Sequence, residues 1–236
     1  MAISAPIIET FSSLQGEGKF AGSLHIFVRF AGCDLNCKFC DTPDARDPEA
    51  GRPVNVEELI VEAEGLEPAF HRMVALTGGE PLTHADFIAQ FLRTCRREGR
   101  INLPYLLETN GCLPQELEKV IAYVDGVSMD IKLPGVYGGP AQWFEHAEFL
   151  KIAALKDLFV KVPVDTGMPA AEFMQAVDLV KSVSRDIPFF IQPVTPRDTL
   201  KPRVSGAELI DYARAASHEL KQVSVMPQLH RILGIK

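Results

Sequence analysis

Residues 32–42 of the chain read GCDLNCKFCDT and place three thiols, those of Cys33, Cys37 and Cys40, within eight residues. Three soft thiolate ligands on one short loop suit a metal centre. Zinc usually closes its structural sites with four protein ligands, whereas a cubane iron-sulfur cluster held by three cysteines keeps one iron open to an outside ligand. The spacing therefore predicts a site in which the protein leaves one coordination position free.

Two other interpretations of these thiols have to be weighed. A disulfide framework would need an even number of cysteines and an oxidising compartment, but the chain has five cysteines and no signal peptide is expected ahead of them. A zinc site completed by a distant ligand stays open on spacing alone, because Cys95, Cys112 and six histidines are available. We expect Cys95 and Cys112 to be packing residues.

A second motif sits at residues 73–81, where an apolar segment, MVAL, runs into TGGEP. Adjacent glycines expose backbone amides at the end of a strand, and the glutamate can orient an amino group there. A glycine pair alone indicates only a turn. Together with a CxxxCxxC loop, it resembles the methionine-binding strand of radical S-adenosylmethionine (SAM) enzymes.

Bulk composition limits the class of protein. The 236 residues are 47% hydrophobic, which is sufficient for one large α/β domain, and we expect residues 1–236 to form it. The net charge of −7 argues against a broad phosphate-binding surface, so we expect a small-molecule substrate and no nucleic acid. No apolar run reaches the roughly twenty residues of a membrane span, and a reducing, cytoplasmic location is expected.

Strand-like and helical segments alternate from residue 24 to residue 226, which predicts an α/β fold with a mainly parallel sheet: a partial (β/α) barrel, open on one side. Capping patterns predict helix starts near residues 56 and 84, and the proline-rich segment 43–53 is expected to be irregular. The predicted strands are 24–30, 73–76, 101–107, 126–131, 158–163, 188–192 and 222–226.

Polar residues recur where these strands end: Arg29, the glycine turn, ETNG at 108–111, SMDIK at 128–132 and Gln192. Each alone would be unremarkable, since a turn or a surface ion pair has the same composition. Because carboxyl ends of parallel strands meet at one edge, we expect them to share a site with the cysteine loop.

Motifs over nearly the whole chain resemble the 7-carboxy-7-deazaguanine synthase family. The cysteine loop and GGEP identify only the radical SAM superfamily, whereas LQGEG at 14–18, CDT at 40–42 and QLHRILGI at 228–235 are typical of this family. The resemblance implies a compact radical SAM barrel with reduced helix content. It further implies three functional segments: a substrate loop at 9–18, the cluster loop at 32–42 and a C-terminal segment at 222–236 that closes the site.

The resemblance also implies the reaction and its cofactors. Members convert 6-carboxy-5,6,7,8-tetrahydropterin into 7-carboxy-7-deazaguanine with loss of ammonia, in 7-deazapurine (queuosine or archaeosine) biosynthesis. A 4Fe-4S cluster held by Cys33, Cys37 and Cys40 cleaves SAM, and the resulting 5′-deoxyadenosyl radical takes hydrogen from the pterin, so no side chain is expected to be catalytic. Thr42 is implied to bind Mg²⁺, although capping of the loop is its simpler role.

Binding residues follow from the same resemblance. Arg29 is implied to grip the substrate carboxylate, with a structural salt bridge as the alternative. The implied substrate residues are Leu14, Gln15, Gly16, Glu17, Arg29, Thr77, His230 and Lys236. The implied SAM residues are Gly78, Gly79, Glu80, Glu108, Ser128, Met129, Asp130, Lys132 and Gln192.

A homodimer and an electron donor such as flavodoxin or ferredoxin are the expected partners. Two alternative functions remain at this point. A glycyl-radical activating enzyme would share the cluster loop but act on a peptide, and a zinc-stabilised binding module would have no catalytic role.

Overall fold

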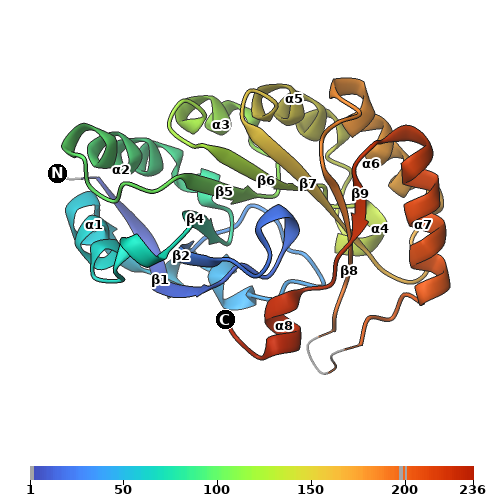
Figure 1. Ribbon diagram of the computed structural model, residues 1–236, viewed down its shortest axis with the longest axis horizontal. Coiled ribbons are helices and arrows are strands. Elements are labelled where there is room, and N and C mark those ends of the chain that lie inside the picture. The colour runs from blue at the N-terminus through green and yellow to red at the C-terminus, as the bar shows by residue number, and fades with distance from the viewer. Residues whose placement is uncertain (1–2, 197–198, 200) are drawn as a thin grey trace.

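The computed structural model describes residues 3–196, 199 and 201–236. Within this part of the chain, a curved nine-stranded sheet has helices on its outer, convex face (Figure 1). The strands are β1 (Ser4–Leu14), β2 (Leu24–Phe30), β3 (Arg52–Asn55), β4 (Met73–Gly78), β5 (Tyr105–Thr109), β6 (Gly126–Asp130), β7 (Asp157–Val164), β8 (Phe189–Pro193) and β9 (Val223–Val225). The helices are α1 (Val56–Glu64), α2 (Ala85–Glu98), α3 (Pro114–Val120), α4 (Pro134–Tyr137), α5 (Trp143–Ala153), α6 (Ala170–Val183), α7 (Gly206–Glu219) and α8 (Leu229–Leu233).

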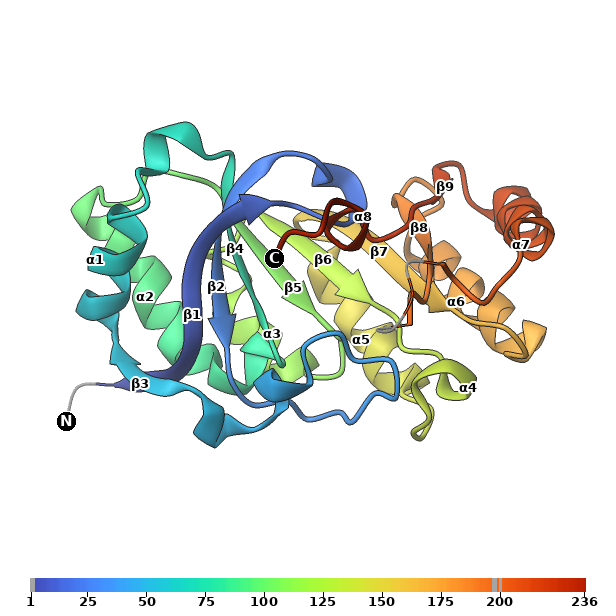
Figure 2. The ribbon, with the colours of Figure 1, turned by 90° about the horizontal axis from the view of Figure 1, so that it is seen from below.

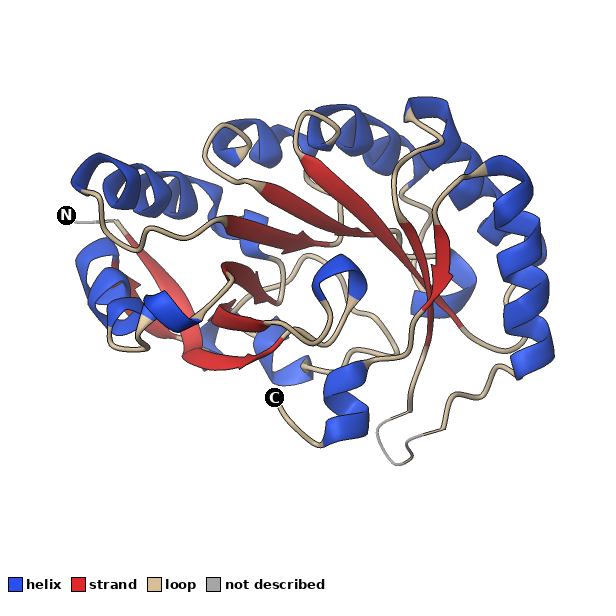
Figure 3. Cartoon of the chain, in the orientation of Figure 1, coloured by secondary structure: helices blue, strands red, loops and turns tan. Residues whose placement is uncertain are grey.

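The order of the strands is β3-β1-β2-β4-β5-β6-β7-β8-β9, and every pair from β2 to β9 is parallel. Helical crossovers connect these parallel strands, as Figure 3 shows, and α3 spans only seven residues. β1 pairs antiparallel with β2 on one side and β3 on the other. The predicted mainly parallel sheet, open rather than closed into a barrel, is confirmed.

Sequence patterning located most of the strands. β2 has the predicted bounds, whereas β5 begins at Tyr105 rather than at residue 101. Ile101 has a positive φ of 47°, and Pro104 lacks the N–H that a central strand needs. β1 and β3 were not predicted, and the expectation that 43–53 is irregular is wrong in part, because residues 52–55 pair with β1 as β3.

Both helix starts fall close to their predicted positions. The side chain of Asn55 accepts from Glu58 N at 3.1 Å and the Glu58 carboxylate accepts from Asn55 N at 2.8 Å, so the predicted capping box begins α1. The second predicted box is wrong. A 3₁₀ turn at Pro81–His84 precedes α2, and the Thr83 hydroxyl donates to the Glu80 carbonyl at 2.7 Å instead of capping.

Successive side chains along each strand point to opposite faces of the sheet, and this separates two apolar regions. Side chains that point to the helices form the main core, and residues on the concave face form a smaller cluster. We call this cluster the floor; it consists of Phe20, Met73, Leu106, Phe159 and Phe190, with Met226 packed against it. Among the described residues no helix is long and apolar enough to cross a membrane.

Candidate active site

A cavity of about 300 Å³ lies on the concave face of the sheet, above the floor. Figure 2 shows α8 lying across this side of the sheet. Most of the predicted site residues line the cavity: Leu14, Gln15, Gly16, Glu17, Arg29, Cys33, Cys37, Cys40, Thr42, Thr77, Gly78, Gly79, Glu108, Asp130, Lys132, Gln192, His230 and Lys236. Among the described residues, the predicted ones outside this lining are Glu80, Ser128 and Met129.

Six neighbouring parallel strands, β2 and β4 to β8, each contribute a polar residue to one level of the cavity lining. These residues lie at inward-facing positions, two residues further along the strand than a residue that faces the base of the cavity. We call them the upper layer: Arg29, Thr77, Glu108, Asp130, Lys161 and Gln192. The upper layer is thus a row of polar side chains that come from six separate segments of the sequence.

The three loop cysteines are partly exposed and face this cavity. Their loop is anchored by Asn110 Nδ2, which donates to Asp34 Oδ1 at 2.7 Å, and by Lys38 N, which donates to the Tyr137 carbonyl at 3.0 Å. Burial raises the pKa of Cys33 to about 12 and also raises that of Cys37. For Cys33 and Cys37 the protonated thiol is therefore favoured until a metal replaces the proton.

Cys95 and Cys112 are buried elsewhere, as expected of packing residues. Cys95 lies in α2 within the main core. Cys112 Sγ lies 3.6 Å from both the Asn110 carbonyl and His146 Nε2, beneath the cavity lining. In the described part of the chain neither thiol lines the cavity, so the donor set fits a cubane cluster bound by three cysteines.

The glycine turn after β4 touches the cysteine loop. A Cβ on Gly79 would lie 2.1 Å from the Gly32 carbonyl oxygen, and one on Gly78 would lie 2.2 Å from that of Phe30. Gly78 also has a φ of +133°, which an L residue rarely adopts. Both glycines are therefore required for the backbone of β4 to approach the loop, independently of any ligand.

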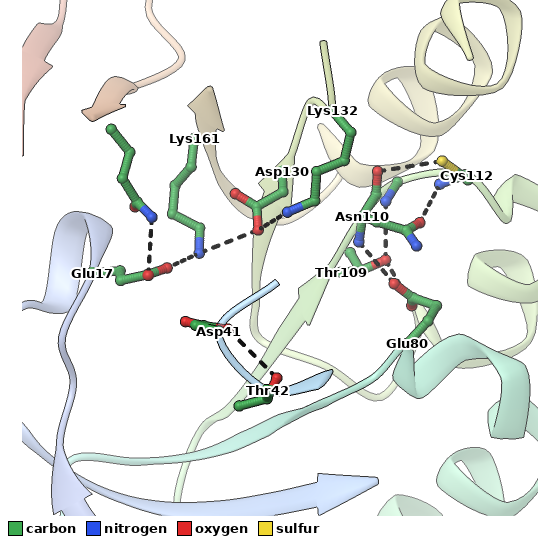
Figure 4. A network of polar contacts seen from close by, with 12 residues as sticks. Glu17, Asp41, Thr42, Glu80, Thr109, Asn110, Cys112, Asp130, Lys132 and Lys161 are labelled. Atoms are coloured by element: carbon green, nitrogen blue, oxygen red, sulfur yellow. Dashed lines mark hydrogen bonds and ion pairs between the residues drawn. The ribbon is translucent and has the colours of Figure 1, made fainter. Parts of the chain in front are cut away.

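Glu80 follows these glycines but lies under the cavity rather than in it. Its carboxylate accepts hydrogen bonds from Leu82 N (3.0 Å), Thr109 Oγ1 (2.9 Å) and Asn110 N (2.8 Å), as Figure 4 shows for the last two. Full burial raises its pKa to about 7 despite these donors. The side chain thus joins the end of β4 to the end of β5, which differs from the expected contact with an amino group in the cavity.

The other two predicted residues outside the lining are on β6. Met129 points into the main core, because it alternates with Asp130, and its Cε would meet a Cβ on Gly111 at 2.4 Å. Ser128 is on the concave face but only 1% exposed, level with Glu108 on β5. The side chains of Ser128 and Met129 thus both lie outside the cavity lining.

A network of alternating charges crosses the upper layer, as Figure 4 shows. Lys161 Nζ pairs closely with Glu17 and lies 3.6 Å from Asp130 Oδ2, which is itself 3.1 Å from Lys132 Nζ. Burial acts to raise the pKa of Glu17, but the Lys161 ammonium outweighs it and the pKa is lowered. Burial likewise acts to lower the pKa of Lys161, and the carboxylates of Asp130 and Glu17 raise it instead. The charged forms of Glu17 and Lys161 are thus favoured by their pairing.

Glutamine side chains orient the carboxylates of the cavity. Glu17 Oε1 accepts from Gln192 Nε2 at 3.0 Å and from Gln228 Nε2 at 2.9 Å. Gln15 Nε2 donates to Glu108 Oε1 at 2.6 Å, and burial raises the pKa of Glu108. Lys161 and Gln228 were not predicted; a lysine inside the apolar segment LFVKVPV is the signal that could have revealed the first.

The C-terminal segment closes over the cavity. Leu229 N donates to the Gly16 carbonyl at 2.9 Å, and a Cβ on Gly16 would meet His230 Nδ1 at 2.1 Å. Gln228 Nε2 also donates to Asp41 Oδ2 at 3.1 Å, and the Ser13 hydroxyl donates to the Lys236 carbonyl at 2.8 Å. α8 therefore connects the loop after β1 with the cysteine loop.

Arg29 could bind an anionic ligand, and the oxygen and nitrogen atoms near Asp41 could bind a cation. Arg29 Nε lies 3.0 Å from Glu9 Oε1, so the structural salt bridge is present, and the guanidinium also lines the cavity above Phe11. Thr42 Oγ1 donates to Asp41 Oδ1 at 3.5 Å. Ligand atoms of Glu17, Asp41 and His230 lie within 4.8 Å of one another.

Comparison with known proteins relates the chain to one group of enzymes. Residues 27–135 match the family model of the radical SAM superfamily. The 7-carboxy-7-deazaguanine synthase of Geobacter sulfurreducens is 35% identical over 98% of this chain and 97% of its own length, and that of Methanothermobacter thermautotrophicus is 35% identical over 98% of both.

Solved structures share the fold. The crystal structure of QueE from Escherichia coli superimposes with a TM-score of 0.61 over 94% of both chains at 20% identity. Streptococcus suis SuiB bound to S-adenosylmethionine gives a TM-score of 0.56 over 83% of this chain and 44% of its own, at 15% identity. At these identities the likeness concerns the fold alone.

Proposed function

Because this chain belongs to the 7-carboxy-7-deazaguanine synthase family of radical SAM enzymes, we propose that it converts 6-carboxy-5,6,7,8-tetrahydropterin into 7-carboxy-7-deazaguanine with loss of ammonia. The observation that carries this proposal is the shared cavity. The three loop cysteines, the glycine turn and the family's LQGEG segment all line it, although they are far apart in sequence. A peptide-activating enzyme or a zinc-binding module has no comparable support among these relatives.

The cofactors would occupy the side of the cavity nearest the cysteine loop. A 4Fe-4S cluster on Cys33, Cys37 and Cys40, with SAM on its open iron, would supply a 5′-deoxyadenosyl radical. Asp130 and Lys132, which line the cavity, would bind polar groups of SAM, and Gly78, Gly79, Glu108 and Gln192 would also contact it. Glu80, Ser128 and Met129 would support this subsite from below.

The substrate would occupy the side covered by α8. The guanidinium of Arg29 can donate to the substrate carboxylate, because it faces the cavity while Nε is held by Glu9. Glu17 can accept from the aminopyrimidine ring, and His230 closes the same side. Leu14, Gln15, Gly16, Thr77 and Lys236 complete this part of the lining.

A magnesium ion would fit between the two subsites. Thr42 offers a hydroxyl, and the adjacent carboxylate of Asp41 is a hard oxygen ligand of the kind that Mg²⁺ prefers. Such an ion, with several waters, would offset the charge of the substrate carboxylate. The ion would thereby orient the substrate ring relative to SAM.

Partners and location belong to the same proposal. Exposed apolar side chains in or beside α8, those of Ile232, Leu233 and Ile235, support a homodimer that covers this face. A light-scattering mass equal to one chain would exclude it. A reducing cytoplasm and a donor such as flavodoxin or ferredoxin would keep the cluster competent.

Anaerobic turnover tests the proposal directly. Cluster-reconstituted enzyme, SAM and a reductant are incubated with 6-carboxy-5,6,7,8-tetrahydropterin, with and without Mg²⁺, and the product is identified by mass spectrometry. We expect 7-carboxy-7-deazaguanine, with a higher rate when Mg²⁺ is present. Zinc without iron or sulfide in the purified protein, or SAM cleavage without the deazaguanine, would contradict the assignment.

A further inference from the structure

We propose that Lys161 and Glu17 together read the lactam edge of the substrate ring, the N3–H and C4 carbonyl of a 2-amino-4-oxopteridine. The inference deepens the proposed function and rests on it. It assigns a role to Lys161, which lies on β7 and lines the cavity.

Lys161 has donors left to offer. Its side chain is 4% exposed, and it lines the cavity from the middle of β7. The ammonium pairs closely with Glu17, but Asp130 Oδ2 at 3.6 Å is beyond hydrogen-bond distance. An ammonium has three N–H donors, and within the described part of the chain Glu17 is its hydrogen-bonded partner. A ligand in the cavity can therefore accept from Lys161.

Glu17 offers an acceptor beside this donor. An ionised carboxylate has about four lone-pair sites. Within the described residues, Gln192 and Gln228 fill two on Oε1, and Lys161 fills one on Oε2. The two amides hold the carboxylate in place, so its remaining site stays next to the Lys161 ammonium.

An acceptor next to a donor is the complement of a cyclic amide. In a 2-amino-4-oxopteridine, N3–H donates and the neighbouring C4 carbonyl accepts, which matches Glu17 and Lys161 in turn. In a 2,4-diaminopteridine, neutral N3 accepts and the 4-amino group donates, so both contacts would be mismatched. Buried polar groups left unpaired by the wrong ligand make such discrimination strong.

Binding of two stable analogues tests the inference. Pterin-6-carboxylate and 2,4-diaminopteridine-6-carboxylate differ at position 4, with the corresponding change at N3, and neither contains the hydrogen that is removed from the substrate. Their dissociation constants are measured by anaerobic calorimetry at pH 7 with cluster-reconstituted enzyme and SAM. We expect the wild type to prefer the oxo compound by roughly tenfold to a hundredfold.

Variants assign the preference to Lys161. Lys161→Met and Lys161→Gln should each lower the affinity ratio severalfold or more, because Met offers no donor and the shorter Gln side chain ends further from the ligand. Glu17 keeps the remainder of the preference through its contact with N3–H. Lys151→Met, which removes an exposed lysine paired with Glu148 on α5, should keep the wild-type ratio. A ratio is used because any general weakening of the site acts on both analogues alike.

Three outcomes would overturn the inference. The wild type could bind both analogues equally. This comparison uses no variant, so it still tests the inference if Lys161→Met fails to fold. The affinity ratio could stay at the wild-type value in both Lys161 variants, in which case the lysine merely balances the carboxylates. Binding of neither analogue to the wild type would overturn the proposed pterin substrate, and the inference with it.

Discussion

The upper layer and the floor of the cavity are built by the same strands on the same face, yet they differ completely in character. On β7 the sequence passes from Phe159 in the floor to Lys161 in the upper layer, and on β8 from Phe190 to Gln192. On β5 the step is from Leu106 to Glu108. Since successive inward-facing residues are two apart, each strand makes this change within one repeat of its pleat.

The difference shows how charged groups are kept in a buried site. The floor packs aromatic rings, with Phe159 edge-on to both Phe20 and Phe190, and seals the base of the cavity against water. Above it, each charge of the upper layer lies beside an opposite charge or a donor. Changes to the floor should therefore affect stability, and changes to the site above it should affect ligand binding.

The largest expected effect comes from removing a thiol above the upper layer. Cys37→Ala should lose the cluster, and turnover should fall below detection, because two cysteines cannot hold the cubane. Iron, sulfide and product are measured on the reconstituted protein. Cys95→Ala is the matched control, since this thiol is buried in α2. Loss of iron in the control as well would show that the two thiols have no separate roles.

Breaking the floor should cost stability instead. Phe159→Ala removes a ring that is 1% exposed, and we expect a loss of about 3–5 kcal/mol in the free energy of unfolding. Urea denaturation under anaerobic conditions measures it. Phe144→Ala, at a side chain that is 71% exposed, should change stability little. A stable Phe159→Ala protein without affinity for SAM would contradict the division between floor and upper layer.

A change within the upper layer should have a smaller and different effect. Arg29→Ala should weaken binding of the carboxylated pterin by roughly tenfold to a hundredfold, the usual value of a charge-assisted hydrogen bond. The iron content should stay at the wild-type level. Arg52→Ala provides a control at an exposed arginine that pairs with Glu62. If Arg29→Ala loses iron in proportion to its affinity, the arginine supports the fold instead.

The smallest expected effect is on the pH dependence of stability, through the buried side chain of His25 in β2. Burial first, and then the nearby charge of Arg72, lowers the pKa of His25 to about 4 from an ordinary value of 6.5. The unfolded chain therefore binds the proton first, and stability present above pH 6.5 is lost as the pH falls toward 4. When the pH is lowered from 7 to 5, the free energy of unfolding should fall by about 2 kcal/mol less in His25→Gln than in the wild type. Identical pH profiles in thermal unfolding would refute the prediction.

Local patterns predicted the parts of the molecule that depend on local sequence. The cysteine loop, the glycine turn and β2 follow from spacing and from apolar runs. β1 did not, because its polar side chains bond to residues far away in sequence, such as Thr10 to Glu62 and Ser12 to His71. Its register with β2 also shifts between Ile7 and Glu9. Lys161 was missed for a similar reason, since its partner Glu17 lies 144 positions away. The buried position of Glu80 depends likewise on β5.

The contacts of Gln228 have a consequence for how the protein is made. Its amide bonds to Glu17, 211 positions earlier, and to Asp41, 187 positions earlier. While a ribosome still holds residue 228 in its exit tunnel, the cavity lacks the side that α8 provides. This side of the cavity, with its hydrogen bonds to Glu17 and Asp41, is therefore among the last parts of the fold to be assembled.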